Sequence, residues 1–186
     1  MIDKPILAAH IASVATLRGE FILRSGAVAN EYFDKYRFEG NPQLLDAIAQ
    51  HLSQLIPQGT QALAGLELGG VPIATALCLR TGLPAVFVRK RAKEYGTRQL
   101  AEGRDVRGLR LLLVEDVVTS GGQIIASAGD LRGLGARVTD AVCVINRESG
   151  GEAAVAAAGI TLHSLFTKAD LAFARAREAT VSAPGA

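Results

Sequence analysis

The chain has 186 residues, 49% of them hydrophobic, and a formal net charge of +2 at pH 7. This length suits one well-buried domain, and no apolar run approaches the roughly 18 residues of a membrane span. The small charge does not indicate nucleic-acid binding by itself and the N-terminus does not resemble a signal peptide, so we expect a cytoplasmic protein without nucleic-acid or membrane partners.

The first sixty residues predict a helix, two short strands and a second helix. Apolar residues recur every three or four positions over 5–17, which is typical of a helix. Short strands are expected over 21–26 and 32–36, joined by a polar turn. A second helix is expected over 42–55, with Asn41 at its N-cap and proline at its first position.

From residue 61 onward, predicted strands and helices alternate. The strands are expected over 61–66, 84–89, 109–115 and 136–145, and the helices over 71–81 and 123–134. This alternation predicts an α/β fold with a central, mostly parallel sheet flanked by helices. Cys78 and Cys143 stand among aliphatic neighbours and are expected to be buried thiols. The polar tail after Arg177 is expected to be frayed.

The segment 91–108 has almost no apolar periodicity and is the most basic part of the chain. Eight basic and three acidic residues lie between Arg89 and Arg110, so this stretch carries a net +5 and the remainder a net −3. A loop of this length inside a compact domain is usually functional or disordered. Such a concentration of positive charge favours a polyanionic ligand.

An aliphatic strand at 111–114 is followed by the acidic pair Glu115-Asp116 at its carboxyl end and by the turn Thr119-Ser120-Gly121-Gly122. Ligands of open α/β sheets bind outside the carboxyl ends of strands, and a glycine-containing turn at a helix start suits a phosphate. Two carboxylates would repel that phosphate, but they accept hydrogen bonds strongly from hydroxyls. A sugar phosphate satisfies both requirements. The alternative is an ordinary strand, turn and helix with a capping Thr or Ser.

This segment resembles the 5-phosphoribosyl 1-diphosphate (PRPP) signature of the type I phosphoribosyltransferases. The resemblance implies that Glu115 and Asp116 hold the ribose hydroxyls and that the turn holds the 5′-phosphate. The remaining PRPP contacts it implies here are Val117, Val118, Thr119, Ser120, Gly121, Gly122 and Gln123. The segment 67–70 resembles the loop that takes the released diphosphate, which adds Leu68 and Gly69.

Residues 89–97 narrow the resemblance to the orotate phosphoribosyltransferases, because they look like the basic loop of that family. By this resemblance Arg89, Lys90 and Lys93 contact the diphosphate of PRPP and act in catalysis. Tyr95 stands where some members carry His. The same resemblance implies a homodimer in which Lys90 reaches the site of the neighbouring subunit.

Two further segments resemble the parts of the family that contact or cover the base. Residues 146–151 match the segment whose arginine, here Arg147, contacts the orotate carboxylate, and Thr119 would approach orotate as well. Residues 21–26 and 32–35 resemble the N-terminal hood that covers the base, where Arg24 replaces the usual Lys. The chain is thus expected to be a single domain over 1–186, with a hood over about 1–40 and a core over about 41–175.

The resemblance implies that orotate and Mg²⁺-bound PRPP give orotidine 5′-monophosphate and diphosphate, with the metal held mainly by PRPP. Two alternatives remain: a phosphoribosyltransferase for another base, such as a purine, or a PRPP-sensing regulator that has lost catalysis. Single residues also have simpler interpretations. Arg147 could form a surface ion pair, Lys90 and Lys93 a solvated loop face, and Glu67 and His163 structural hydrogen bonds.

Overall fold

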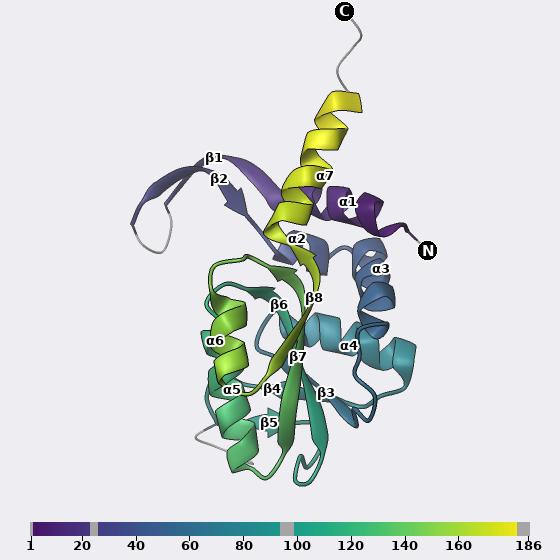
Figure 1. Ribbon diagram of the computed structural model, residues 1–186, viewed down its shortest axis with the longest axis vertical. Coiled ribbons are helices and arrows are strands. Elements are labelled where there is room, and N and C mark those ends of the chain that lie inside the picture. The colour runs from purple at the N-terminus through teal and green to yellow at the C-terminus, as the bar shows by residue number, and fades with distance from the viewer. Residues whose placement is uncertain (1, 23–25, 94–98, 182–186) are drawn as a thin grey trace, which may run out of the picture.

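The central feature of the computed structural model, which describes residues 2–22, 26–93 and 99–181, is a six-stranded sheet (Figure 1). Its strand order is β5-β4-β3-β6-β7-β8. The strands are β3 (Ala62–Leu66), β4 (Ala85–Val88), β5 (Ala101–Glu102), β6 (Arg110–Val118), β7 (Arg137–Asn146) and β8 (Thr161–Thr167). Every neighbouring pair is parallel except β4 and β5, which confirms the predicted mostly parallel α/β sheet.

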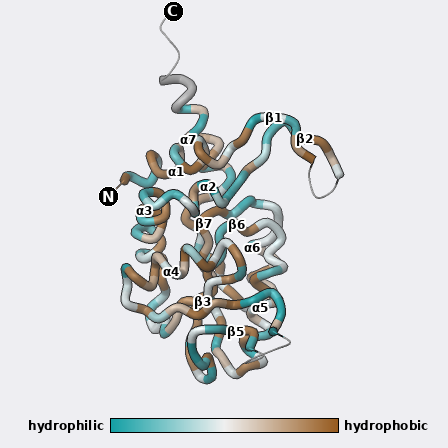
Figure 2. Tube along the Cα trace, turned by 180° about the vertical axis from the view of Figure 1, so that it is seen from behind, coloured by the Kyte–Doolittle hydropathy of each residue, from teal (hydrophilic) through white to brown (hydrophobic). Residues whose placement is uncertain are grey.

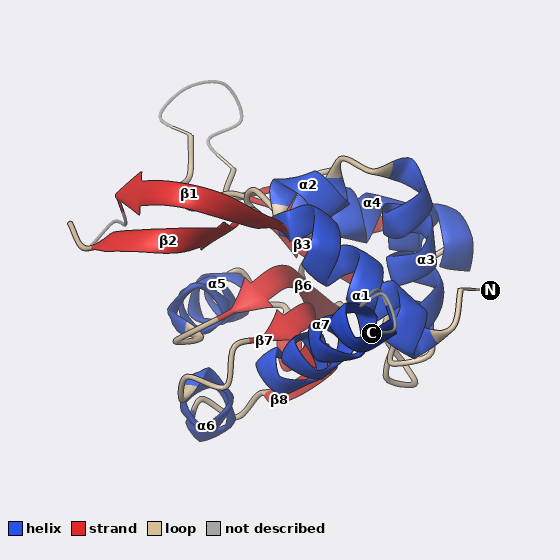
Figure 3. Ribbon diagram, turned by 90° about the horizontal axis from the view of Figure 1, so that it is seen from above, coloured by secondary structure: helices blue, strands red, loops and turns tan. Residues whose placement is uncertain are grey.

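Helices cover both faces of this sheet (Figure 3). They are α1 (Lys4–Ala15), α2 (Tyr36–Glu39), α3 (Pro42–Ser53), α4 (Gly70–Thr81), α5 (Gly122–Gly133), α6 (Gly151–Ala157) and α7 (Lys168–Val181). Side chains alternate along β6, so Leu112 and Val114 join the core formed with α1, α3 and α4, whereas Leu111 and Leu113 join the core formed with α5. The central strand β3 is buried throughout and hydrophobic along its length (Figure 2).

A separate hairpin of β1 (Thr16–Ile22) and β2 (Val28–Phe33) projects beyond the sheet as an arm, with α1 and α7 near its base (Figure 1). Arg175 of α7 donates to Glu31 of β2 at 3.0 Å and thereby ties the arm to the last helix. The strands expected over 21–26 and 32–36 were placed too late, because α1 ends at Ala15 and the chain becomes extended at once. The hood boundary near residue 40 stays a prediction.

Other element boundaries agree with the sequence more closely. The side chain of Asn41 accepts hydrogen bonds from the backbone N–H groups of Gln43 and Leu44, both at 3.1 Å, which confirms the N-cap of α3. The strand β6 is longer than expected, because Val117 and Val118 still pair with Ile145 and Asn146 of β7. The acidic pair therefore lies inside the strand and not at its end, which corrects the expected position.

The last third of the chain contains elements that no pattern predicted: α6, β8 and α7. The helix α7 continues to Val181, so the expected fraying after Arg177 is wrong for the first four residues of that tail.

Cys143 is a buried free thiol as expected, whereas Cys78 is free and only partly buried. Within the described parts of the chain, none of the helices combines the length and apolarity needed to cross a membrane.

Candidate functional site

A cavity of about 160 Å³ lies where β6 passes into α5. Its lining includes one member of the acidic pair and the whole predicted phosphate turn: Glu115, Val117, Val118, Thr119, Ser120, Gly121, Gly122, Gln123 and Ile124. The first N–H groups of α5 have no partner within the helix, and the helix start carries partial positive charge. The structure thus brings these predicted PRPP contacts together around a space that can receive a phosphate.

Gly121 gives this turn its shape. It precedes α5 with a φ of 75°, in the left-handed region. A Cβ at this position would lie 2.6 Å from Cγ2 of Val155 and 2.9 Å from the carbonyl oxygen of Gly151, both in α6. Any other residue would strain the turn and push α6 away from it. The glycine is therefore required both by its backbone angle and by the close packing of α6.

The two acidic residues face different surroundings, because adjacent residues of a strand point to opposite faces. Glu115 lines the cavity and is 8% exposed. Asp116 is fully buried and does not line it. Its Oδ1 accepts from the backbone N–H of Val117 at 2.5 Å, and its Oδ2 lies 2.5 Å from Nζ of Lys35. The carboxylate of Asp116 is thus surrounded by polar groups, so a ribose hydroxyl could reach it only if those groups moved.

Gly69 packs directly against Asp116. A Cβ on Gly69 would lie 1.5 Å from Oδ2 of Asp116, so only glycine fits there. The residue immediately precedes α4, and the peptide bond between Glu67 and Leu68 is cis. The structure therefore brings Gly69 of the predicted diphosphate loop into contact with Asp116 of the predicted ribose-binding pair. Leu68 is exposed beside it.

Three acidic side chains and one lysine share this region, and their pKa values diverge. Burial and the proximity of Asp116 raise the pKa of Glu115 to about 9, and the same two causes raise the pKa of Glu39 to about 9. Burial alone would raise the pKa of Asp116, but hydrogen bonds from Glu115 and Glu39 and the ammonium of Lys35 outweigh it and hold the pKa below its usual value. At neutral pH the anion of this group is therefore Asp116. A protonated Glu115 that donates its proton to Asp116 can still accept a hydrogen bond from a hydroxyl in the cavity.

The basic residues predicted to contact diphosphate follow β4, which lies two strands from β6 in the same sheet. Arg89 and Lys93 both pair with Glu102 of β5, at 3.3 Å and 2.5 Å. These hydrogen bonds hold the pKa of Glu102 below its usual range. The backbone N–H of Lys90 donates to Glu67 at 3.0 Å, which connects this segment to the diphosphate loop. Tyr95 lies outside the described residues.

Arg147 follows β7, and its backbone N–H donates to the carbonyl of Val118 at 2.9 Å. Its guanidinium lies over the ring of Phe33 in β2, 5.7 Å from the centroid. Both residues line a cavity of about 270 Å³ between the arm and α7, which Lys168 and Arg175 also line. Arg147 is therefore stacked on the arm. Arg24 lies outside the described residues, so the structure does not place it.

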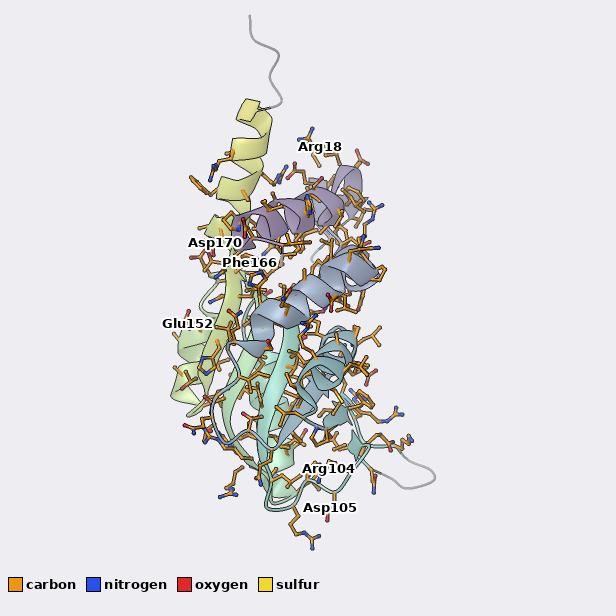
Figure 4. The ribbon with its side chains drawn as sticks, turned by 90° about the vertical axis from the view of Figure 1, so that its right-hand side faces the viewer. Arg18, Arg104, Asp105, Glu152, Phe166 and Asp170 are labelled. Carbon is orange, nitrogen blue, oxygen red and sulfur yellow. The ribbon has the colours of Figure 1, made fainter. Side chains whose placement is uncertain are left out.

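A much larger cavity, about 900 Å³, lies between α1 and α7 and is bordered by Phe166 and Asp170 (Figure 4). Its lining is mostly apolar and includes none of the predicted site residues. Cavity size thus does not mark the site. The site is marked by the convergence of a glycine turn, a helix start and carboxyl groups.

Comparisons with known proteins agree with this geometry. The family model of the phosphoribosyl transferase domain matches residues 37–163. The orotate phosphoribosyltransferase of Nocardioides sp. is 53% identical over 169 residues, which cover 91% of this chain and 94% of that protein. The chain belongs to the orotate phosphoribosyltransferase family.

Solved structures of this family have the same fold. The orotate phosphoribosyltransferase of Mycobacterium tuberculosis H37Rv in complex with Fe(III) dicitrate has a TM-score of 0.82 and 31% identity, covering 90% of this chain and 98% of that one. Its complex with PRPP has a TM-score of 0.78 and 28% identity, covering 91% and 98%. The similarity therefore extends over about nine tenths of this chain.

Sequence reasoning missed three residues of this orotate phosphoribosyltransferase site. Lys35 and Glu39 approach Asp116, and Glu102 pairs with the predicted catalytic cations. Lys35 stands in the hood segment, but nothing in its spacing indicates a partner far away in the sequence. An acidic residue close to a basic loop could have pointed to Glu102, since such residues often pair with the bases.

Proposed function

We propose that this protein transfers the phosphoribosyl group of PRPP to orotate, giving orotidine 5′-monophosphate and diphosphate in pyrimidine biosynthesis. The observation that carries the proposal is the cavity at the start of α5, in which a left-handed glycine turn and a carboxyl group face one another. The 53% identity with an orotate phosphoribosyltransferase over 91% of the chain supports orotate as the base.

In this proposal PRPP is held from two ends. The backbone and hydroxyls of the turn, from Thr119 to Gly122, bind the 5′-phosphate, assisted by the start of α5. Glu115 binds the ribose hydroxyls from the cavity, and Asp116 does so once the polar groups around its carboxylate move aside. The residues that border this ribose 5-phosphate through their backbone are Val117, Val118 and Gln123. Leu68 and Gly69 bind the diphosphate.

The chemistry breaks the glycosidic C–O bond through a transition state like an oxocarbenium ion and needs no nucleophilic side chain. Negative charge grows on the departing diphosphate, and fixed cations stabilise such charge most where water is excluded. Arg89, Lys90 and Lys93 supply these cations, with Tyr95 beside them. Because Arg89 and Lys93 pair with Glu102 in this structure, the diphosphate must compete with a carboxylate for them.

The base is bound on the side of the arm. Arg147 pairs with the orotate carboxylate, for which a guanidinium is geometrically suited, and Arg24 provides a second positive charge. Thr119 belongs to the proposed phosphate turn. Its carbonyl oxygen also packs against Gly151, in the segment that follows Arg147. In this proposal Thr119 therefore lies between the phosphate and the orotate. This arrangement favours a base that carries a carboxylate.

We include Mg²⁺ in the proposal as an ion carried by PRPP. Mg²⁺ usually keeps several waters and is bound by few protein ligands together with substrate phosphates, so we expect diphosphate oxygens and water to hold it. When bound, it neutralises part of the diphosphate charge. Lys90 and Lys93 complete that neutralisation from the protein.

We also propose a homodimer in which Lys90 serves the neighbouring site, as the family resemblance implies. Mixing inactive Lys90→Ala with an inactive Gly121→Ala variant should restore part of the activity, because each hetero-dimer contains one intact site. Hetero-dimers verified by differential tags that show no recovery would exclude sharing. A cytoplasmic location, without nucleic-acid or membrane partners, stays a prediction.

The proposed function is tested by following the loss of orotate absorbance with purified protein and Mg²⁺-PRPP. Uracil, adenine and hypoxanthine serve as competing bases in the same assay. Turnover of orotate alone supports the proposal, whereas preferred turnover of another base would reassign the substrate. PRPP binding without turnover of any base, combined with nucleic-acid retention, would identify a regulator instead.

A further inference from the structure

Lys35 lies at the joint between the arm and the core. It immediately precedes α2, and the backbone on its N-terminal side is held by a hydrogen bond from the N–H of Asp34 to the carbonyl of Ala15 at 2.8 Å. The backbone N–H of Tyr36 donates to the side chain of Asp34 at 3.2 Å. The position of the Lys35 backbone is therefore fixed from both sides.

The ammonium of Lys35 reaches down from this joint to Asp116 of β6. The distance between Nζ and Oδ2 is 2.5 Å; the lysine side chain is 33% exposed and the aspartate side chain 1%. The contact is an ion pair, since Oδ2 makes no hydrogen bond of suitable geometry among the described residues. A buried carboxylate without a counter-charge is costly, so this lysine stabilises the anionic form of Asp116.

Glu39 of α2 approaches the same carboxylate. Its Oε1 is buried and has no hydrogen-bond partner among the described residues. If Glu39 and Asp116 were both ionised, they could not hydrogen-bond to each other, because ionised carboxylates only accept. A proton on Glu39 supplies the missing donor toward Asp116, and it agrees with the raised pKa of Glu39. Lys35 and Glu39 thus bind Asp116 from one short segment of the chain.

The other groups that face Asp116 leave Lys35 as its counter-charge. Glu115 on the same strand is protonated at neutral pH, as described above. On β7, burial raises the pKa of the Cys143 thiol to about 12, so it is neutral as well. The ring of Tyr36 lies 5.3 Å from the ammonium of Lys35. Gly69 and Gly70, which pack on β6 from the start of α4, bring no charge.

We propose that Lys35 is a positioning residue for PRPP: it holds Asp116 as an oriented anion and thereby couples the arm to the ribose and diphosphate binding elements. The proposal rests on the proposed function. Its physical consequence is specific, because Asp116 lies between Lys35 on one side and Gly69 of the diphosphate loop on the other. Without the ammonium, Asp116 takes up a proton more readily and loses its fixed orientation against that loop.

The test compares Lys35→Met, which keeps the length of the side chain, with Lys35→Arg, which keeps the charge. Lys4→Met is the matched control, since Lys4 is an exposed lysine at the start of α1. Calorimetry measures the Kd for Mg²⁺-PRPP, and steady-state assays give KM and kcat. We expect Lys35→Met to raise the Kd and the KM for PRPP at least about tenfold with a much smaller change in kcat, and Lys35→Arg to recover most of this loss.

The pH dependence separates positioning from a merely structural role. In Lys35→Met the affinity for PRPP should fall more steeply than in the wild type as the pH is lowered, because Asp116 without its counter-charge becomes protonated at a higher pH than in the wild type. If Lys35 only supported folding, thermal stability would fall while the pH dependence of PRPP binding stayed parallel to that of the wild type. Parallel profiles, unchanged affinity or tighter binding in folded Lys35→Met would each overturn the proposal.

The same substitution can also be tested in the Asp116→Asn variant, which keeps the test decisive if Lys35→Met alone fails to fold. In Asp116→Asn the carboxylate charge is gone, so adding Lys35→Met should change the Kd for PRPP less than about twofold if Lys35 acts through Asp116. A further tenfold loss would show that Lys35 acts on PRPP directly and would overturn the proposal. A wild-type protein that binds no PRPP overturns the proposed function as well, whereas normal binding by folded Lys35→Met overturns positioning alone.

Discussion

Replacing Gly69 by Ala tests the packing of the diphosphate loop on the buried aspartate. The backbone of Gly69 has a φ of −66° and a ψ of −28°, which alanine adopts without strain, so any effect comes from the added methyl group. That Cβ would lie 1.5 Å from Oδ2 and 2.3 Å from Cγ of Asp116. Because ordinary contact begins near 3.4 Å, the oxygen must retreat by about 1.9 Å or the loop must lift by a similar distance.

A displacement of this size separates Asp116 from Lys35, since their atoms are only 2.5 Å apart. Breaking a buried ion pair costs about 3–5 kcal/mol. For a domain of 150–250 residues each kcal/mol lowers the Tm by about 2–4 °C, so we expect a decrease of about 6–20 °C. Binding of PRPP should weaken in parallel, because the proposed ribose-binding pair and the proposed diphosphate loop are both disturbed.

Thermal unfolding followed by circular dichroism gives the change in stability, and calorimetry with Mg²⁺-PRPP gives the change in affinity. Gly129→Ala is the matched control: Gly129 lies inside α5, and apart from the backbone of that helix nothing lies within 4 Å of the place that a Cβ would occupy. Alanine there should stabilise the helix by about 0.5–1 kcal/mol. If Gly69→Ala unfolds within 1 °C of the wild type and binds PRPP normally, the tight packing against Asp116 is refuted.

Three further predictions follow from the same site. Lys93→Ala should lower kcat by about 10² with the fold intact, the scale of losing one transition-state donor, and near-normal turnover would exclude that role. Gly121→Ala should abolish detectable PRPP binding in calorimetry, because it strains a left-handed turn and collides with Val155 at 2.6 Å; retained binding would contradict the phosphate turn. The pKa values of Glu39 and Glu115 are about 9 in the folded protein and about 4.5 in the unfolded chain. Between these values the folded state binds more protons than the unfolded state, so the free energy of unfolding of the wild type should fall as the pH rises across that window. Urea unfolding of Glu39→Gln should show about half of this dependence, and an unchanged slope would contradict the protonated Glu39.

Features set by local pattern were the ones that could be predicted from the sequence. The strand, glycine turn and helix over 109–134 follow from an apolar run, turn residues and helical periodicity within a single segment. The N-cap at Asn41 is equally local, since its acceptor and donors are two or three residues apart. The predicted sheet class needed only the alternation of such segments.

Features set by distant partners could not be predicted in this way. The end of β6 depends on its pairing with β7, so the acidic pair appeared to follow a strand that in fact continues to Val118. The contact of Lys35 with Asp116 joins residues that are far apart in sequence, and no periodicity encodes it. The arm strands were misplaced for a related reason: their residues are mostly exposed, so burial imposes no alternating pattern on them.

The acidic pair connects two layers of the protein because a strand turns successive side chains to opposite faces. Glu115 points toward the cavity at the start of α5, where a phosphate turn and a protonated carboxyl group can receive a sugar phosphate. Asp116 points toward the other layer, where it contacts Gly69 of the diphosphate loop and Lys35 at the base of the arm. Two neighbouring carboxyl groups therefore need not repel one another at neutral pH, since one keeps its proton and the other has a lysine. The same alternation explains why one dipeptide can join the proposed ribose site, the proposed diphosphate loop and the arm.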